Sequence, residues 1–262
     1  MAEHQIRFED GAAYERMMGT WSRLAGDIFL DWLAPRKGLK WIDVGCGNGA
    51  FTELIVARGA PADVQGIDPS DGQLAYASAR SGAAMAKFRK GDAMALPFAD
   101  RAFDVAIMAL VIFFVPEPAR GVAEMVRVVA PGGAVAAYAW DMAGGGFPLQ
   151  PVQTELLAMG FPPLRPPSSD VSKMDALQRL WKGAGLVDVE TRRIDVQRSF
   201  ADFDDFWSAS TLGSSIAPVV ASMAPDDLKR LREAVRARMP TDSAGRVVYG
   251  AWANAIKGRV PG

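Results

Sequence analysis

The chain has 262 residues, of which half are apolar and 23% are charged, and its formal net charge is −1. This balance is typical of one large α/β domain with a sizeable core, so we expect residues 1–262 to form a single domain. A nearly neutral chain has no general attraction for nucleic acid or for an anionic membrane, and neither is an expected partner. Composition leaves the oligomeric state open.

Cysteine usage and hydropathy indicate the compartment. The single cysteine, Cys46, excludes an intrachain disulfide and fits a reducing environment. Residues 1–10 lack the apolar core of a signal peptide, and the longest apolar run, residues 105–115, is too short to cross a bilayer. We therefore expect a cytoplasmic protein without a membrane span, and no metal site is predicted.

Residues 11–34 have the period of an amphipathic helix, because large apolar side chains recur at spacings of three and four. They are Tyr14, Met17, Met18, Trp21, Leu24, Ile28 and Trp32. Most of this stripe is expected to face the core. Tyr14 and Trp21 are also candidates for lining a ligand pocket, since aromatic side chains with a polar tip often do so.

A glycine-rich turn follows the first predicted strand. The apolar run 41–44 is typical of a strand buried on both faces, and a helical run over 51–58 ends at Gly59. Between them lie Gly45, Gly47 and Gly49. Glycines at such a turn let the backbone approach a ligand closely, and the following helix offers unpaired N–H groups. By itself this turn does not identify the ligand.

The sequence of the turn is compatible with two classes of ligand. Gly45, Gly47 and Ala50 satisfy G-x-G-x-x-G/A, the dinucleotide pattern, so an NAD-type site has to be considered. Asp43, in the strand just before the turn, would repel a pyrophosphate but attract an ammonium and a sulfonium. The acid therefore favours S-adenosylmethionine, although Asp43 could also serve only as an acceptor for backbone N–H groups.

The second predicted strand, residues 62–69, ends in another acid. Asp68 stands where a strand-end carboxylate can accept both hydroxyls of a ribose. The alternative is that Asp68 caps the next helix. Ser70 or Asp71 can serve as that cap, which leaves Asp68 for a ligand.

Three more strands alternate with helices. A helix is expected over 73–80 and another through Val122, Met125 and Val129, and the strands are residues 87–93, 103–109 and 134–140, the last following a break at 131–133. Five strands that alternate with helices predict a parallel, doubly wound sheet.

Together these stretches resemble class I S-adenosylmethionine-dependent methyltransferases, above all the small-molecule group that includes quinone and other metabolite methylases. The resemblance is carried by residues 43–49, 66–68, 91–98, 103–104 and 127–133, and it covers residues 39–140 well. It implies a seven-stranded sheet of order 3-2-1-4-5-7-6 whose last strand is antiparallel.

The same resemblance implies the cofactor residues. The turn through Gly45, Cys46 and Gly47 would hold the methionyl part. Asp68 would hold the ribose diol, and Asp92 and Ala93 would read the adenine. The other residues expected to bind the cofactor are Asp43, Pro69, Leu110, Tyr14 and Trp21. Tyr14 and Trp21 belong to a stretch that looks like the helix preceding the fold in this group.

One departure concerns a general base. Many relatives have a histidine in the loop after the fourth strand, where this chain has Phe113 and Phe114. The tetrapeptide that amino-methylating nucleic-acid enzymes place there, Asp or Asn followed by Pro-Pro-aromatic, is also absent from the sequence. Methylation of a nucleobase is therefore not expected.

Beyond residue 140 the pattern loosens. Residues 141–172 are predicted to be a long loop that serves as a lid or binding segment. A helix over 174–184, a strand over 186–196, a second excursion over 200–240 and a final strand over 247–256 complete the chain. The cofactor-binding core is thus placed at about 35–140, and lid or substrate segments at about 10–34, 141–172 and 200–240.

The expected acceptor is small, largely apolar and planar, because aromatic residues gather at the predicted site. Phe113 and Phe114 follow the fourth strand, Trp140 ends the fifth, and Trp207 lies in the second excursion. His4 and Asp141 are weak candidates for acid–base groups, and no catalytic residue is named. An NAD-type oxidoreductase and a non-catalytic S-adenosylmethionine-binding protein remain alternatives.

Overall fold

The computed structural model describes residues 15–212 and 215–262. Seven strands form one sheet of order β3-β2-β1-β4-β5-β7-β6. They are β1 Lys40–Val44, β2 Asp63–Asp68, β3 Lys87–Lys90, β4 Phe103–Ala109, β5 Val129–Trp140, β6 Val187–Phe200 and β7 Val247–Arg259. The pairs from β3 to β5 are parallel, and β7 runs antiparallel to both β5 and β6. This is the topology that the sequence resemblance implied.

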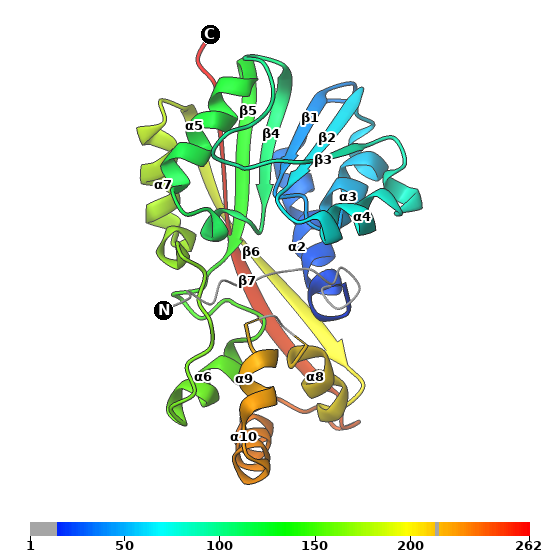
Figure 1. Cartoon of the computed structure of the whole chain (residues 1–262), viewed down its shortest axis with the longest axis vertical. Coiled ribbons are helices and arrows are strands. Elements are labelled where there is room, and N and C mark those ends of the chain that lie inside the picture. Colours follow the sequence, from blue (N-terminus) through cyan, green and yellow to red (C-terminus); the bar gives the residue numbers. More distant parts are fainter. Residues whose placement is uncertain (1–14, 213–214) are drawn as a thin grey trace.

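Helices cover both faces of the sheet (Figure 1). Helix α2 packs against α3, and α5 packs against α7, so the two pairs belong to separate layers. The helices are α2 Thr20–Leu33, α3 Ala50–Gly59, α4 Asp71–Ser78, α5 Pro118–Val128, α6 Gln150–Ala158, α7 Met174–Gly183, α8 Phe203–Ser210, α9 Ala217–Ser222 and α10 Pro225–Arg238. A π-helical turn, η1 Glu15–Gly19, precedes α2, and three 3₁₀ turns are η2 Ser81–Ala83, η3 Ile112–Phe114 and η4 Ser169–Ser172.

The central strands are buried on both faces, as the continuous apolar runs predicted. All of Trp41 to Val44 are buried, and Val105 to Met108 are likewise shielded from solvent. Burial on both faces follows from helices lying on either side of a parallel sheet. The carboxyl ends of β1, β2 and β4 therefore meet at one edge, where the loops carry the candidate site.

Among the predicted strands, the boundaries of β5 and β6 differ most from the structure. Strand β5 begins at Val129 rather than at residue 134. The strand does not stop at the predicted break, because a register shift opposite β4 accommodates Gly132, which has φ +77°. Strand β6 continues to Phe200 rather than ending at 196. Its extension pairs with β7 as far as Val247, and Val196 and Phe200 are buried between more exposed residues.

Residues 141–172 are not the uninterrupted loop that the sequence predicted, since they contain α6 and η4. Helix α6 lies against α10, and Glu155 of α6 forms an ion pair with Arg238 of α10. A helix this short depends on tertiary contacts for its stability, which a single-segment pattern does not reveal. A separate lobe lies at the bottom of Figure 1. It is formed by helices α6, α8, α9 and α10 and by the outer ends of β6 and β7.

Candidate functional site

The glycine turn is fixed to the end of β2 by backbone hydrogen bonds. The N–H groups of Gly45 and Cys46 both donate to the carbonyl oxygen of Ile67, at 2.7 and 2.9 Å. Gly45 has φ +76°, and a Cβ placed on it would lie 2.4 Å from a methyl carbon of Val111. Only glycine combines that backbone with that contact. The turn is therefore held rigidly beside the loop that follows β4.

Gly47 differs from Gly45 in what surrounds it. Its φ is +52°, yet a Cβ placed on it would meet only Gln73 Oε1, at 3.9 Å. Packing against the protein therefore does not require glycine here. The open space lies at the point where the turn precedes the N-terminus of α3, which is where unpaired backbone N–H groups bind ligands. The turn thus fits a ligand that approaches its backbone closely.

Asp68 is the acceptor that organises this edge. Its Oδ2 accepts from the N–H of Gly47 and its Oδ1 from the N–H of Ser70, both at 2.9 Å. Ser70 in turn caps α4 by accepting from the N–H of Gln73, as the sequence allowed. Burial raises the pKa of the Asp68 carboxyl, and the two backbone N–H groups oppose that rise. A carboxylate has further lone pairs, so two bound N–H groups leave room for ligand hydroxyls.

Asp43 lies behind the turn rather than at its surface. The side chain is fully buried, and its Oδ2 accepts from the Thr52 hydroxyl at 2.6 Å. Among the described residues, Asp43 Oδ1 has no hydrogen-bond partner. Desolvation, with a smaller contribution from the charge of Asp68, raises the pKa of Asp43 to about 7. Its carboxyl is then only partly ionised at neutral pH, so the attraction for a cationic ligand is weaker than the sequence argument assumed.

The thiol of Cys46 lies against β2. The thiol is buried, and a Cβ on Gly66 of β2 would lie 2.9 Å from its sulfur. Burial, reinforced by the charges of Asp43 and Asp68, raises the pKa of Cys46 well above its ordinary value. A buried protonated thiol is not a nucleophile. Cys46 therefore contributes its backbone and its packing to the turn.

The residues predicted to bind the adenine, Asp92 and Ala93, lie in a loop that Arg127 stabilises through hydrogen bonds. Asp92 is exposed and its Oδ1 accepts from the N–H of Met94 at 2.8 Å. The guanidinium of Arg127, on α5, donates to the carbonyl oxygens of Leu96 and Phe98 at 3.0 and 2.8 Å. We did not predict this role for Arg127. The signal was present in the sequence as an acid, Glu124, three residues earlier, since the two residues form an ion pair on one helix face.

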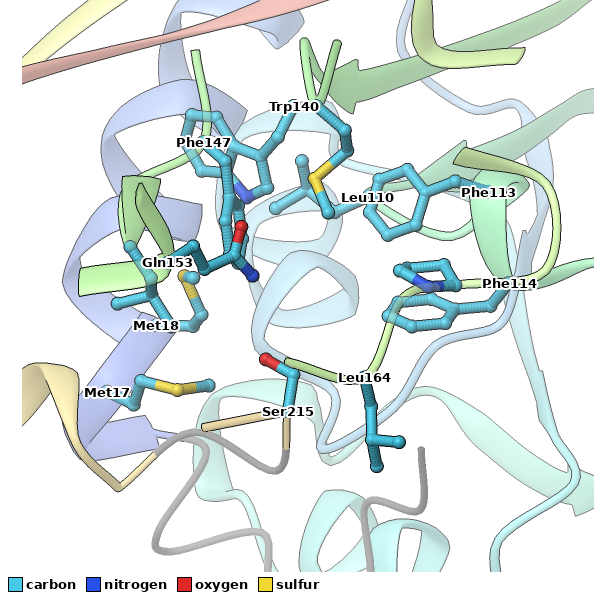
Figure 2. Close-up of a pocket in the computed structure, with 13 residues that line it drawn as sticks. Met17, Met18, Leu110, Phe113, Phe114, Trp140, Phe147, Gln153, Leu164 and Ser215 are labelled. Atoms are coloured by element: carbon cyan, nitrogen blue, oxygen red, sulfur yellow. The ribbon is translucent and has the colours of Figure 1, made fainter. Parts of the chain in front are cut away.

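An apolar cavity lies where the chain leaves β4 (Figure 2). Leu110 lines it, with φ +62° and its N–H donating to the carbonyl oxygen of Tyr138. A left-handed leucine is uncommon and marks a position that the surrounding structure has fixed. The other lining residues are Met17, Met18, Phe113, Phe114, Trp140, Met142, Phe147, Leu149, Gln153, Leu164, Pro166 and Ser215.

This cavity brings together three of the four predicted acceptor residues. Phe113, Phe114 and Trp140 line it, and the rings of Phe113 and Phe114 are 4.7 Å apart. Trp207 lies on α8, where it stacks on Phe203, and is not among the lining residues. The cavity volume is about 40 Å³, well below the roughly 150 Å³ of a cavity that holds benzene. An aromatic acceptor therefore requires the lining to move, and methionine side chains do so readily.

The segment before α2 is attached directly to the glycine turn. The Glu15 carboxylate accepts from Asn48 Nδ2 at 2.9 Å and pairs with Arg80. Arg80 also donates from Nε to the carbonyl oxygen of Asn48 at 2.7 Å and from Nη1 to Glu53 at 2.7 Å. Met17 and Met18 of the same π-helical turn reach the cavity. The polar half of this segment was missed, because the sequence analysis followed only its apolar period.

Other sequence candidates have simpler positions. Trp21 is 1% exposed, and its ring packs against Phe200 and Tyr249 in the core. Asp141 initiates the loop after β5, with Oδ1 accepting from the N–H of Gly144 at 2.8 Å and Oδ2 from Trp252. Pro69 is exposed at the end of β2, next to Asp68. Tyr14 and His4 lie outside the described residues. The role of Trp21 in cofactor binding remains a prediction.

Within the part of the chain that the structure describes, no helix is both long and apolar enough to cross a lipid bilayer.

Comparison with known proteins identifies the class. The family model described as "Methyltransferase domain" matches residues 42–137. Across 115 residues the chain is 38% identical to the ubiquinone/menaquinone biosynthesis C-methyltransferase UbiE of Roseobacter denitrificans, covering 42% of this chain and 46% of that protein. The chain thus spans just under half the length of the curated relatives that it matches.

Solved structures agree on the fold. Phosphoethanolamine N-methyltransferase 2 of Haemonchus contortus, in complex with S-adenosyl-L-methionine, gives a TM-score of 0.60 at 17% identity and covers 96% of this chain and 57% of that one. The [4+2]-cyclase SpnF gives 0.55 at 20% identity and covers 92% and 81%. The sequence match over residues 42–137 and the fold of the described residues together support a class I S-adenosylmethionine-dependent methyltransferase.

Proposed function

We propose that this protein binds S-adenosylmethionine at the glycine turn and transfers the methyl group to a small, largely apolar metabolite. One observation carries the proposal. The apolar cavity begins at Leu110, directly beside the turn through Gly45 that Val111 packs against. A cofactor held by the turn would therefore present its reactive end to a hydrocarbon-lined space.

The residues at the turn fit this cofactor. Gly47 leaves space for the methionyl part, and Asp68 retains lone pairs for the ribose diol, with Pro69 beside it. Asp92, whose carboxylate is exposed, and Ala93 are assigned to the adenine. When bound, the cofactor supplies an electrophilic methyl group on a sulfonium. The protein then has to align the acceptor and exclude water.

The cavity defines the acceptor class. Phe113, Phe114 and Trp140 offer aromatic faces, and burying apolar area contributes about 25 cal/mol per Å². A charged acceptor would lose its hydration without compensation there. An aromatic or quinone-like ring fits best, which agrees with the quinone-pathway name of the similar UbiE protein. The catalytic base, if the acceptor needs one, is not assigned.

A second candidate function is binding without methyl transfer. The [4+2]-cyclase SpnF has a similar fold, so the architecture alone does not define the reaction. An NAD-type oxidoreductase is less favoured, because the methyltransferase model matches the very segment that contains the turn.

The test is methyl transfer from radiolabelled S-adenosylmethionine to a panel of hydroxylated aromatics and quinols. Label in an extractable product, reduced in Asp68→Ala when the cofactor concentration is limiting, supports the proposal. Tight binding of the cofactor with no transfer to any member of the panel would favour the non-catalytic alternative. Binding of NAD in place of S-adenosylmethionine would contradict both.

A further inference from the structure

We propose that the carboxamide of Gln153 positions the acceptor by forming a hydrogen bond with one uncharged oxygen of it, a hydroxyl or a carbonyl. This inference rests on the proposed function and narrows its substrate class. It assigns a role to a residue on α6, a helix that the sequence did not predict.

The side chain of Gln153 lines the cavity and is partly exposed. Figure 2 shows the amide directed toward the space between Trp140, Leu110 and Phe114. Besides Gln153, the polar groups on lining side chains are the indole N–H of Trp140 and the hydroxyl of Ser215, and the rest is hydrocarbon, thioether or aromatic. A polar group among apolar neighbours fixes the orientation in which a ligand binds in such a pocket.

The amide has no hydrogen-bond partner within residues 15–212 and 215–262. Gln150, one turn earlier on α6, shows the contrast, since its Nε2 donates to Thr154 Oγ1 at 3.1 Å. The amide is not fully buried, so a ligand that displaces its water without replacing the hydrogen bond loses about 1–3 kcal/mol of binding free energy. An amide with no protein partner remains available to a ligand in the cavity.

An amide suits a neutral oxygen. It can donate to a carbonyl and accept from a hydroxyl, whereas it offers no charge to balance a carboxylate or an ammonium. One hydrogen bond at the end of a planar ring fixes which atom of the ring faces the methyl group. A pocket built to hydrogen-bond a ligand oxygen also rejects the analogue that lacks it, because the protein group is then left unpaired.

The test compares two probes, 1-naphthol and naphthalene, with the protein saturated by S-adenosylhomocysteine. We expect the wild type to bind 1-naphthol at least ten times more tightly than naphthalene. Gln153→Met keeps the length of the side chain and removes the amide, so the preference should fall to nearly one while naphthalene binds at least as well. Gln150→Met is the matched control, and it should keep the wild-type preference.

Thermal unfolding distinguishes positioning from a structural role. Because the Gln153 amide is unpaired, Gln153→Met should unfold at the wild-type temperature or above it, whereas Gln150→Met should unfold lower. A clear loss of stability in Gln153→Met would contradict the inference.

Two further results would overturn the inference while leaving the proposed function intact. They are an unchanged preference in Gln153→Met, and no binding of 1-naphthol by the wild type although S-adenosylhomocysteine binds. Failure of S-adenosylhomocysteine itself to bind would instead refute the proposed function.

Discussion

Replacing Gly47 by alanine separates the two reasons for having glycine in the turn. Gly45 is required by the protein itself, since its Cβ would collide with Val111. At Gly47 the nearest protein atom would be 3.9 Å away, so the added methyl group enters the space assigned to the cofactor. The substitution should therefore weaken binding of the cofactor much more than it weakens the fold.

The expected magnitudes follow from geometry. A non-glycine residue in the left-handed region costs roughly 1–2 kcal/mol, and Gly47 has φ +52°. A methyl group forced into a well-packed contact costs typically about 1–3 kcal/mol. At about 1.4 kcal/mol per factor of ten, the second effect corresponds to roughly a 5- to 150-fold loss of affinity. The two effects appear in different measurements.

Gly132→Ala is the matched control. Gly132 has φ +77°, and a Cβ placed on it would meet no described atom within 4 Å. It lies near the start of β5, far along the sheet from the carboxyl edge. Urea denaturation should show a similar small loss of stability in both variants. Calorimetric titration with S-adenosylmethionine should show weakened binding only in Gly47→Ala. Equal affinity of the two variants would refute the assignment of the turn to the cofactor.

Three further predictions concern the other site residues. Asp68→Ala should weaken cofactor binding by roughly 10- to 100-fold, since charged hydrogen bonds contribute about 1.5–3 kcal/mol each. Calorimetry should find a smaller loss for Asp92→Ala, and the reverse order would contradict the assignment of Asp68 to the ribose and Asp92 to the adenine. The pKa of Asp43 is about 7 in the folded protein and 3.8 ordinarily, so the folded state binds this proton more tightly and stability falls as pH rises from 4 to 8. Asp43→Asn should remove this pH-dependent loss of unfolding free energy, which amounts to at most about 4 kcal/mol. Denaturation curves with equal pH dependence in variant and wild type would refute the raised pKa of Asp43. Phe113→Ala and Phe114→Ala should lower turnover of an identified acceptor with cofactor affinity unchanged, and unaltered turnover in both would remove the aromatic faces from the acceptor site.

The sequence predicted the cofactor side of the site well because its determinants are local. Alternating strands and helices, the glycines of the turn and the acid at the end of β2 all lie within short stretches, and the Ser70 cap follows from residue type. The order of the outer strands came from the resemblance, since periodicity carries no information on which strands pair. Asp43 was placed correctly in a buried strand, but burial changes its charge, and that depends on packing.

The acceptor side was predicted only in part, because long-range contacts build it. Phe113, Phe114 and Trp140 follow from strand ends, and they do line one cavity. Helix α6 has weak apolar periodicity and is stabilised through Glu155 against α10, so neither the helix nor Gln153 had a local signal.

The most direct measurement is calorimetric titration of the wild-type protein with S-adenosylmethionine, S-adenosylhomocysteine and NAD under the same conditions. The proposed function predicts one site per chain for the first two ligands and no detectable heat with NAD. Saturable binding of NAD, or no binding of either sulfur-containing ligand, would contradict it.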